Sequence, residues 1–133
     1  MAYAQWMSIS LEVVGTTLKV QNATHSWGKF YQCGDKDQEI DPSDIDKLTV
    51  EPNKTTEICA CGRENASAGT TGSFDLYEGD VKVGTYSWDC PWGSKTNKSS
   101  WQPSSNDFIG QLTGGSLDSG ALGSVTLKIA KMS

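Results

Sequence analysis

Hydrophobic and polar residues alternate along much of the chain with the two-residue period of β-strands. The clearest case is the segment 122–131, where Val125, Leu127 and Ile129 are separated by single residues. By the same pattern and by their β-branched and aromatic content, further strands are expected at 3–13, 16–22, 28–33, 47–51, 55–61, 72–78 and 81–88. No window carries a convincing amphipathic helical pattern, and 42–48 is expected to form a single helical turn.

Glycine, proline and asparagine separate these strands. Gly15 predicts a turn after the first strand, while Pro52-Asn53 and Gly79-Asp80 each predict a β-hairpin. The acidic stretch 35–46 is interpreted as a solvated loop, and the polar stretch 93–106 as a long loop. The Gly-rich segments 69–72 and 117–123 lack the sequence of a phosphate-binding loop and are interpreted as β-turns. Strands recurring at this spacing favour an all-β fold, a single-domain antiparallel β-sandwich over residues 1–133.

Composition narrows the function further. The chain has 133 residues, of which 36% are hydrophobic and 20% charged, as is typical of one globular domain. Its net charge of −5 argues against nucleic acid as a partner and against nonspecific adhesion to anionic lipid. We recognise no signal peptide and no apolar stretch long enough to span a bilayer, so we expect a cytoplasmic protein that is released or exported unconventionally.

The four cysteines and the one histidine offer little for catalysis or metal binding. Cys59 and Cys61 are two residues apart and would share one face of a strand. A Cys33–Cys59 or a Cys61–Cys90 disulfide is compatible with the sequence, but buried free thiols are the expected state without a secretion signal. We expect neither a metal nor another cofactor, and no enzymatic activity.

The segment WDCPWGSKTN, at residues 88–97, is the most informative motif. Pro91 and Gly93 place it in a turn, and large aromatic side chains on a turn are costly to leave in water unless an apolar partner covers them. Tryptophan beside a lysine suits a membrane interface, where the ring lies at headgroup depth and the ammonium contacts phosphate. We therefore expect Trp92 to protrude, while Trp88 ends a strand and is partly structural.

The chain resembles the aegerolysins, small acidic β-sandwich proteins. The segments that carry the resemblance are AYAQW at 2–6, SWGKF at 26–30, GDKD at 34–37, ACGR at 60–63, GTTGSFDL at 69–76, WDCPWGSKTN at 88–97 and LDSGALGSVTL at 117–127. The resemblance implies an actinoporin-like sandwich that binds membrane sphingolipids and acts with a larger perforin-like partner in a two-component pore-forming toxin, haemolytic or insecticidal.

The resemblance also implies which residues bind lipid. The tryptophans of the site would be Trp6, Trp27 and Trp92, with Trp88 in a supporting role, and the headgroup lysine would be Lys95. Some sphingolipid-binding aegerolysins carry an acidic residue where this chain has Ala68, which bears on the choice of headgroup.

Two other functions compete with this one. A glycan-binding sandwich would stack the same aromatic rings on sugars. A stand-alone haemolysin would need a long amphipathic segment, which the chain lacks.

Overall fold

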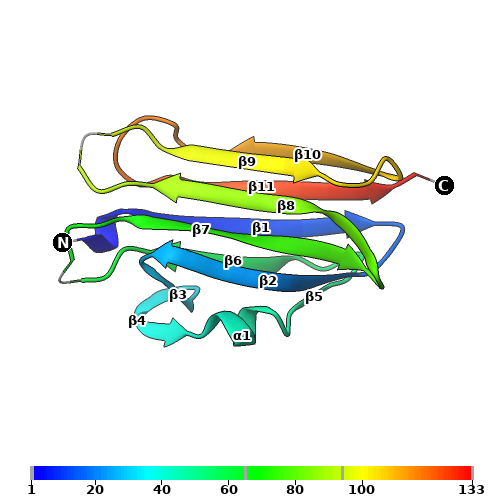
Figure 1. The fold of residues 1–133 in the computed structure, drawn as a ribbon, viewed down its shortest axis with the longest axis horizontal. Helices are drawn as coiled ribbons and strands as arrows, with labels where there is room; N and C mark the ends of the chain where they lie inside the picture. Colours follow the sequence, from blue (N-terminus) through cyan, green and yellow to red (C-terminus); the bar gives the residue numbers. More distant parts are fainter. Residues whose placement is uncertain (1, 65, 94, 133) are drawn as a thin grey trace.

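Alternating burial along the strands produces two β-sheets packed face to face (Figure 1). The computed structural model of the protein describes residues 2–64, 66–93 and 95–132. Within these ranges the six-stranded sheet has the order β10 (Phe108–Gly114), β11 (Gly123–Lys131), β1 (Trp6–Val14), β6 (Thr56–Cys61), β3 (Lys29–Gln32) and β4 (Asp35–Ile40). The five-stranded sheet has the order β5 (Thr49–Val50), β2 (Leu18–Trp27), β7 (Thr70–Glu78), β8 (Val81–Cys90) and β9 (Lys98–Pro103). A short 3₁₀ helix, η1 (Ala2–Ala4), precedes the first strand, and α1 (Pro42–Ile45) is the expected helical turn.

The core lies between the two sheets. Every second residue of β1 from Met7 to Val13 faces inward and is buried. An aromatic cluster fills the middle, with ring centroids 5.5 to 6.4 Å apart; its members are Phe30, Phe74, Tyr86 and Trp88. Burying one such side chain stabilises the fold by about 1.5–3 kcal/mol, so this cluster is a main determinant of stability.

The structure confirms the sandwich and corrects two details of it. β1 and β11 pair in parallel, so the fold is not entirely antiparallel. The hairpin predicted at Gly79-Asp80 joins β7 to β8 as expected. The hairpin predicted at Pro52-Asn53 is wrong: β5 pairs with β2, whereas β6 pairs with β1 and β3. The segment between β5 and β6 therefore crosses from one sheet to the other, which local alternation does not reveal.

Three strands were not predicted. β4 lies in the acidic stretch interpreted as a loop, β9 in the polar stretch 93–106, and β10 at 108–114. All three lie at sheet edges, where most of their residues are exposed; β4 and β9 are mainly polar, and glycines interrupt the alternation in β10.

Gly28 is the point at which the chain passes from β2 in one sheet to β3 in the other. Its φ of +80° is unfavourable for other residues, and a Cβ placed there would lie 2.4 Å from the carbonyl oxygen of Cys61. This close approach holds the end of β2, and with it Trp27, against the end of β6 in the six-stranded sheet.

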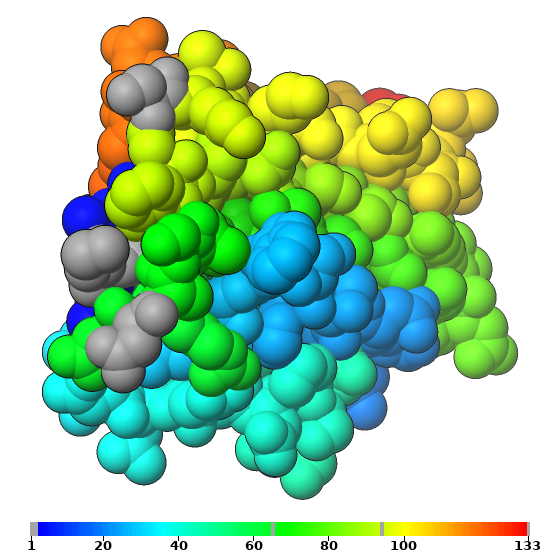
Figure 2. Space-filling view, turned by 60° about the vertical axis from the view of Figure 1, so that its left-hand side comes forward, coloured from blue at the N-terminus to red at the C-terminus, as the bar shows by residue number. Residues whose placement is uncertain are grey.

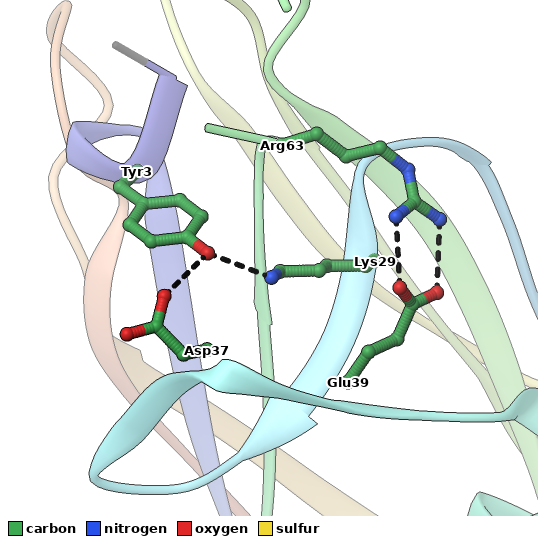
Figure 3. Close-up of polar contacts among 5 residues, drawn as sticks. All are labelled: Tyr3, Lys29, Asp37, Glu39 and Arg63. Atoms are coloured by element: carbon green, nitrogen blue, oxygen red, sulfur yellow. Dashed lines mark hydrogen bonds and ion pairs between the residues drawn. The ribbon is translucent and has the colours of Figure 1, made fainter. Parts of the chain in front are cut away.

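A polar network fastens the same end of the six-stranded sheet (Figure 3). The Tyr3 hydroxyl donates to Asp37 at 3.0 Å and accepts from the buried Lys29 ammonium at 2.9 Å. Nearby, the Arg63 guanidinium donates two hydrogen bonds of 2.8 and 2.9 Å to Glu39, as Figure 3 shows. These contacts join η1, β3, β4 and the segment after β6.

The cysteines divide into two pairs. Cys33 and Cys59 form a disulfide that joins the β3–β4 turn to β6, so the expectation of free thiols is wrong for them. Cys61 and Cys90 are unbonded and buried, as expected. Among the described residues, no helix is long and apolar enough to cross a membrane.

Candidate functional site

Two exposed indoles and a lysine meet at one end of the sandwich. Trp27 is 60% exposed and Trp92 is 40% exposed, and both line a hollow of about 400 Å³. Lys95 lines the same hollow, together with Ser26, Ser67, Ala68, Gly69, Thr71, Asp89 and Pro91. Figure 2 turns this end toward the viewer, with the blue end of β2, the green segment before β7 and the yellow-green segment after β8 side by side.

Local backbone features bring these segments together. Trp27 is the last residue of β2 and is paired with Thr71 on β7. Pro91 cannot continue the ladder of β8, so the chain leaves the sheet there and carries Trp92 outward. Gly69 lets the segment before β7 approach β8, because a Cβ at this position would lie 1.8 Å from the carbonyl oxygen of Cys90.

The hollow carries charges of both signs. Within the described part of the chain, the Lys95 ammonium makes no ion pair, so it is available to an anion. The Asp89 carboxylate also lines the hollow and accepts a hydrogen bond of 2.9 Å from Thr71. Ala68 faces the same space without a charge. Such a site matches a zwitterionic group better than a purely anionic one.

Trp6 lies at the same end but in a different hollow. It is half-buried on the outer face of the six-stranded sheet, packed with Tyr3 and Cys33 against Tyr31, Cys59 and Cys61. The Lys36 ammonium lies 5.4 Å from the centre of its ring, within cation–π range. Trp6 and Lys36 line this second hollow together, so the structure does not join Trp6 to Trp27 and Trp92 in one hollow.

Trp88 lies in the core, and its placement corrects the assignment of this residue to the lipid-binding set. Its side chain is 2% exposed, lies over Gly72 and donates from Nε1 to the Thr70 hydroxyl at 3.0 Å. The register explains the difference: residues 86, 88 and 90 of β8 point inward, whereas Trp92 lies beyond the strand. Trp88 supports the site only through the fold.

Trp101 is also structural. It lies on β9, and its indole covers Gly84 and Gly110, whose missing side chains leave room for the ring. The ring therefore bridges the two sheets at their β9 and β10 edges.

The two free thiols offer no nucleophile. Burial raises the pKa of both Cys61 and Cys90, which keeps them protonated at neutral pH. The Cys90 thiol instead donates to the Gly120 carbonyl at 3.3 Å.

Sequence reasoning missed several residues that line the hollow. Ser26, Ser67 and Asp89 come from three segments distant in sequence, and only folding brings them together. Asp89 lies within the WDCPWGSKTN motif, but an isolated aspartate gives no signal of its own.

The fold and the hollow define a small β-sandwich with an aromatic and cationic surface at one end. The sequence model of the aegerolysin family, described simply as aegerolysin, matches residues 4–132, and the chain belongs to this family. The family consists of lipid-binding haemolysins without enzymatic activity, which confirms the prediction that the protein is not an enzyme.

Curated relatives match nearly the whole chain. Aegerolysin Aa-Pri1 of Cyclocybe aegerita is 45% identical, covering 98% of this chain and 92% of its own. Ostreolysin A6 of Pleurotus ostreatus is 44% identical, covering 98% of each chain. Asp-hemolysin of Aspergillus fumigatus is 42% identical, covering 98% of this chain and 95% of its own.

Solved structures agree with the fold. RahU protein, crystallised in complex with a TRIS molecule, is 43% identical with a TM-score of 0.96, covering 99% of this chain and 98% of its own. The lipid binding protein Nakanori has a TM-score of 0.65 at 8% identity, covering 98% of this chain and 72% of its own, and shows similarity of fold alone.

Proposed function

We propose that this aegerolysin recognises membrane lipids with a sphingolipid-type headgroup, and that the hollow lined by Trp27, Trp92 and Lys95 is its headgroup site. The observation that carries the proposal is the meeting, at one end of the sandwich, of two exposed indoles and an ammonium that forms no ion pair with any residue the structure describes. The indoles would lie at the headgroup boundary while Lys95 contacts the lipid phosphate as a point charge. Asp89 would face the cationic part of a zwitterionic headgroup.

Charge supports a zwitterionic target. The chain has a net charge of −5, so an anionic membrane repels it. Trp6 is a second contact in this proposal, because its hollow opens at the same end of the molecule. The relative named a hemolysin is in keeping with action at membranes.

In the same proposal the protein is the targeting component of a two-component pore-forming toxin. It locates the lipid on the target-cell surface, and a partner with a perforin-like domain inserts to form the pore. This role follows from the resemblance of the chain to aegerolysins that act in such pairs.

Co-sedimentation with liposomes tests the lipid site. The panel contains phosphatidylcholine alone, sphingomyelin with cholesterol, and ceramide phosphoethanolamine. Trp92→Ala and Lys95→Ala are each expected to weaken binding to the preferred liposome about tenfold, equivalent to about 1.4 kcal/mol. The matched controls are Val14→Ala and Lys128→Ala, whose residues line a hollow at the opposite end of β1. Equal binding by all four folded variants would place the site elsewhere.

Dye release tests the division of labour. The pure protein is expected to bind the liposomes without releasing dye. Dye release is expected only when a perforin-domain protein encoded beside its gene is added. Release by the pure protein alone would favour a stand-alone haemolysin.

A glycan-binding function is favoured by one feature, the hydroxyl groups of Ser26, Ser67 and Thr71 around the hollow. Binding to a glycan array that free sugar abolishes, together with no binding to any pure lipid, would establish a glycan-binding function instead.

A further inference from the structure

The loop between β10 and β11 stands beside the hollow and has no role in the site described above. It comprises residues 115–122 and overlaps the Gly-rich segment 117–123, for which the sequence predicts a β-turn. In Figure 2 the orange segment that contains this loop rises at the upper corner of the end that carries the site. Its Leu117 is 60% exposed, as exposed as Trp27.

Hydrogen bonds fix this loop to the segment that carries Trp92 and Lys95. The Asn97 backbone N–H donates to the Leu117 carbonyl at 3.2 Å, and its side-chain amide donates to the carbonyls of Ser116 at 2.9 Å and Gly120 at 3.1 Å. Asn97 is only 3% exposed, so these bonds are protected from water. The Cys90 thiol also bonds the Gly120 carbonyl. Both flanks of the segment, Cys90 before it and Asn97 after it, therefore hold the loop.

The strand register places the loop at the same end as the tryptophans. Gly123, which follows the loop, pairs with Met7 beside Trp6. Thr70, which pairs with Cys90, precedes Thr71, the partner of Trp27. An exposed leucine at this end of the molecule adds a further apolar side chain to the end that already presents two exposed indoles.

We propose that the 115–122 loop is a second membrane-contacting element and that Leu117 enters the bilayer interface at the same end of the molecule as Trp27 and Trp92. Asn97 is its positioning residue. The occupant is the surface of a zwitterionic or neutral bilayer, because the loop carries one charged residue, Asp118, which an anionic surface repels. This inference rests on the proposed lipid-binding function and adds to the headgroup site a contact that is independent of headgroup chemistry.

Fluorescence of a polarity-sensitive dye tests the contact directly. The dye is attached to Leu117→Cys and, as the matched control, to Val14→Cys, whose residue is 68% exposed at the opposite end. The native thiols at Cys61 and Cys90 are buried and Cys33 is bonded to Cys59, so labelling without reductant is selective. On liposomes of sphingomyelin and cholesterol, the emission of the dye at position 117 should shift to the blue, and that at position 14 should not.

Binding measurements complete the test. Leu117→Ala is expected to weaken liposome binding about three- to tenfold, in proportion to the apolar surface removed. Its melting temperature is expected to equal that of wild type. Val14→Ala is expected to leave liposome binding unchanged. If Trp92→Ala weakens binding while the dye at 117 remains in water and Leu117→Ala binds normally, the loop contact is refuted and the headgroup site stands. If the wild-type protein binds none of the liposomes, both proposals fail.

Discussion

Replacing Trp88 by phenylalanine separates a role in the fold from a role in lipid binding. The substitution keeps an aromatic ring in the core but removes the pyrrole part of the indole and its hydrogen bond to Thr70. Thr70 is fully buried, so its hydroxyl would lose a partner without gaining water.

The expected loss of stability follows from two contributions. An unsatisfied buried hydroxyl costs about 1–3 kcal/mol. The apolar surface and the space left by the smaller ring cost about 1–2 kcal/mol more. The free energy of unfolding should therefore fall by about 2–5 kcal/mol, a large part of the 5–15 kcal/mol of a typical domain. Trp88→Ala would exceed this, since Phe or Trp to Ala costs about 3–5 kcal/mol before the hydrogen bond is counted.

Urea unfolding followed by far-ultraviolet circular dichroism measures the change, with the slope against urea confirming an unaltered unfolded state. The folded Trp88→Phe variant is expected to bind liposomes within about twofold of wild type, equivalent to about 0.4 kcal/mol. A variant that keeps the stability of wild type but loses liposome binding would refute the reasoning, because Trp88 would then act at the surface.

Two further predictions concern the framework of the site. Replacing both Cys33 and Cys59 by alanine should lower the free energy of unfolding by about 3 kcal/mol, since the disulfide closes a loop with a sequence separation of 26; a reducing agent should lower the melting temperature of wild type and leave that of the double variant unchanged. The Arg63 hydrogen bonds lower the pKa of Glu39, so their contribution to stability is present above the usual glutamate pKa and is lost as the pH falls through the lowered one. The melting temperatures of wild type and Glu39→Gln should therefore converge in acid, and a constant difference down to low pH would contradict this.

Much of the candidate site was recognisable in sequence because its signals are local. Pro91 and Gly93 mark a turn, and a turn carries Trp92 and Lys95 to the surface whatever the rest of the chain does. Local signals do not indicate that Trp27 and Trp92 line the same hollow, because β2, which ends at Trp27, and β8, which precedes Trp92, are separated in the sheet by β7. Trp6 lies at the same end as the other two tryptophans but lines a different hollow on the outer face of the other sheet, a separation that the sequence does not indicate.

The sequence by itself determined most of the strands, although not β4, β9 and β10, and that the fold is all-β, because a two-residue alternation is a property of each segment alone. Its acidic balance argues against nucleic acid and anionic lipid as partners, which stays a prediction. Only the tertiary structure decided which strands pair, that Trp88 is fully packed in the core against Thr70 and Gly72, and that the 115–122 loop lies at the end that carries Trp27 and Trp92. These outcomes depend on burial between segments distant in the chain, and the free energy of that burial is set by all of the contacting surfaces together.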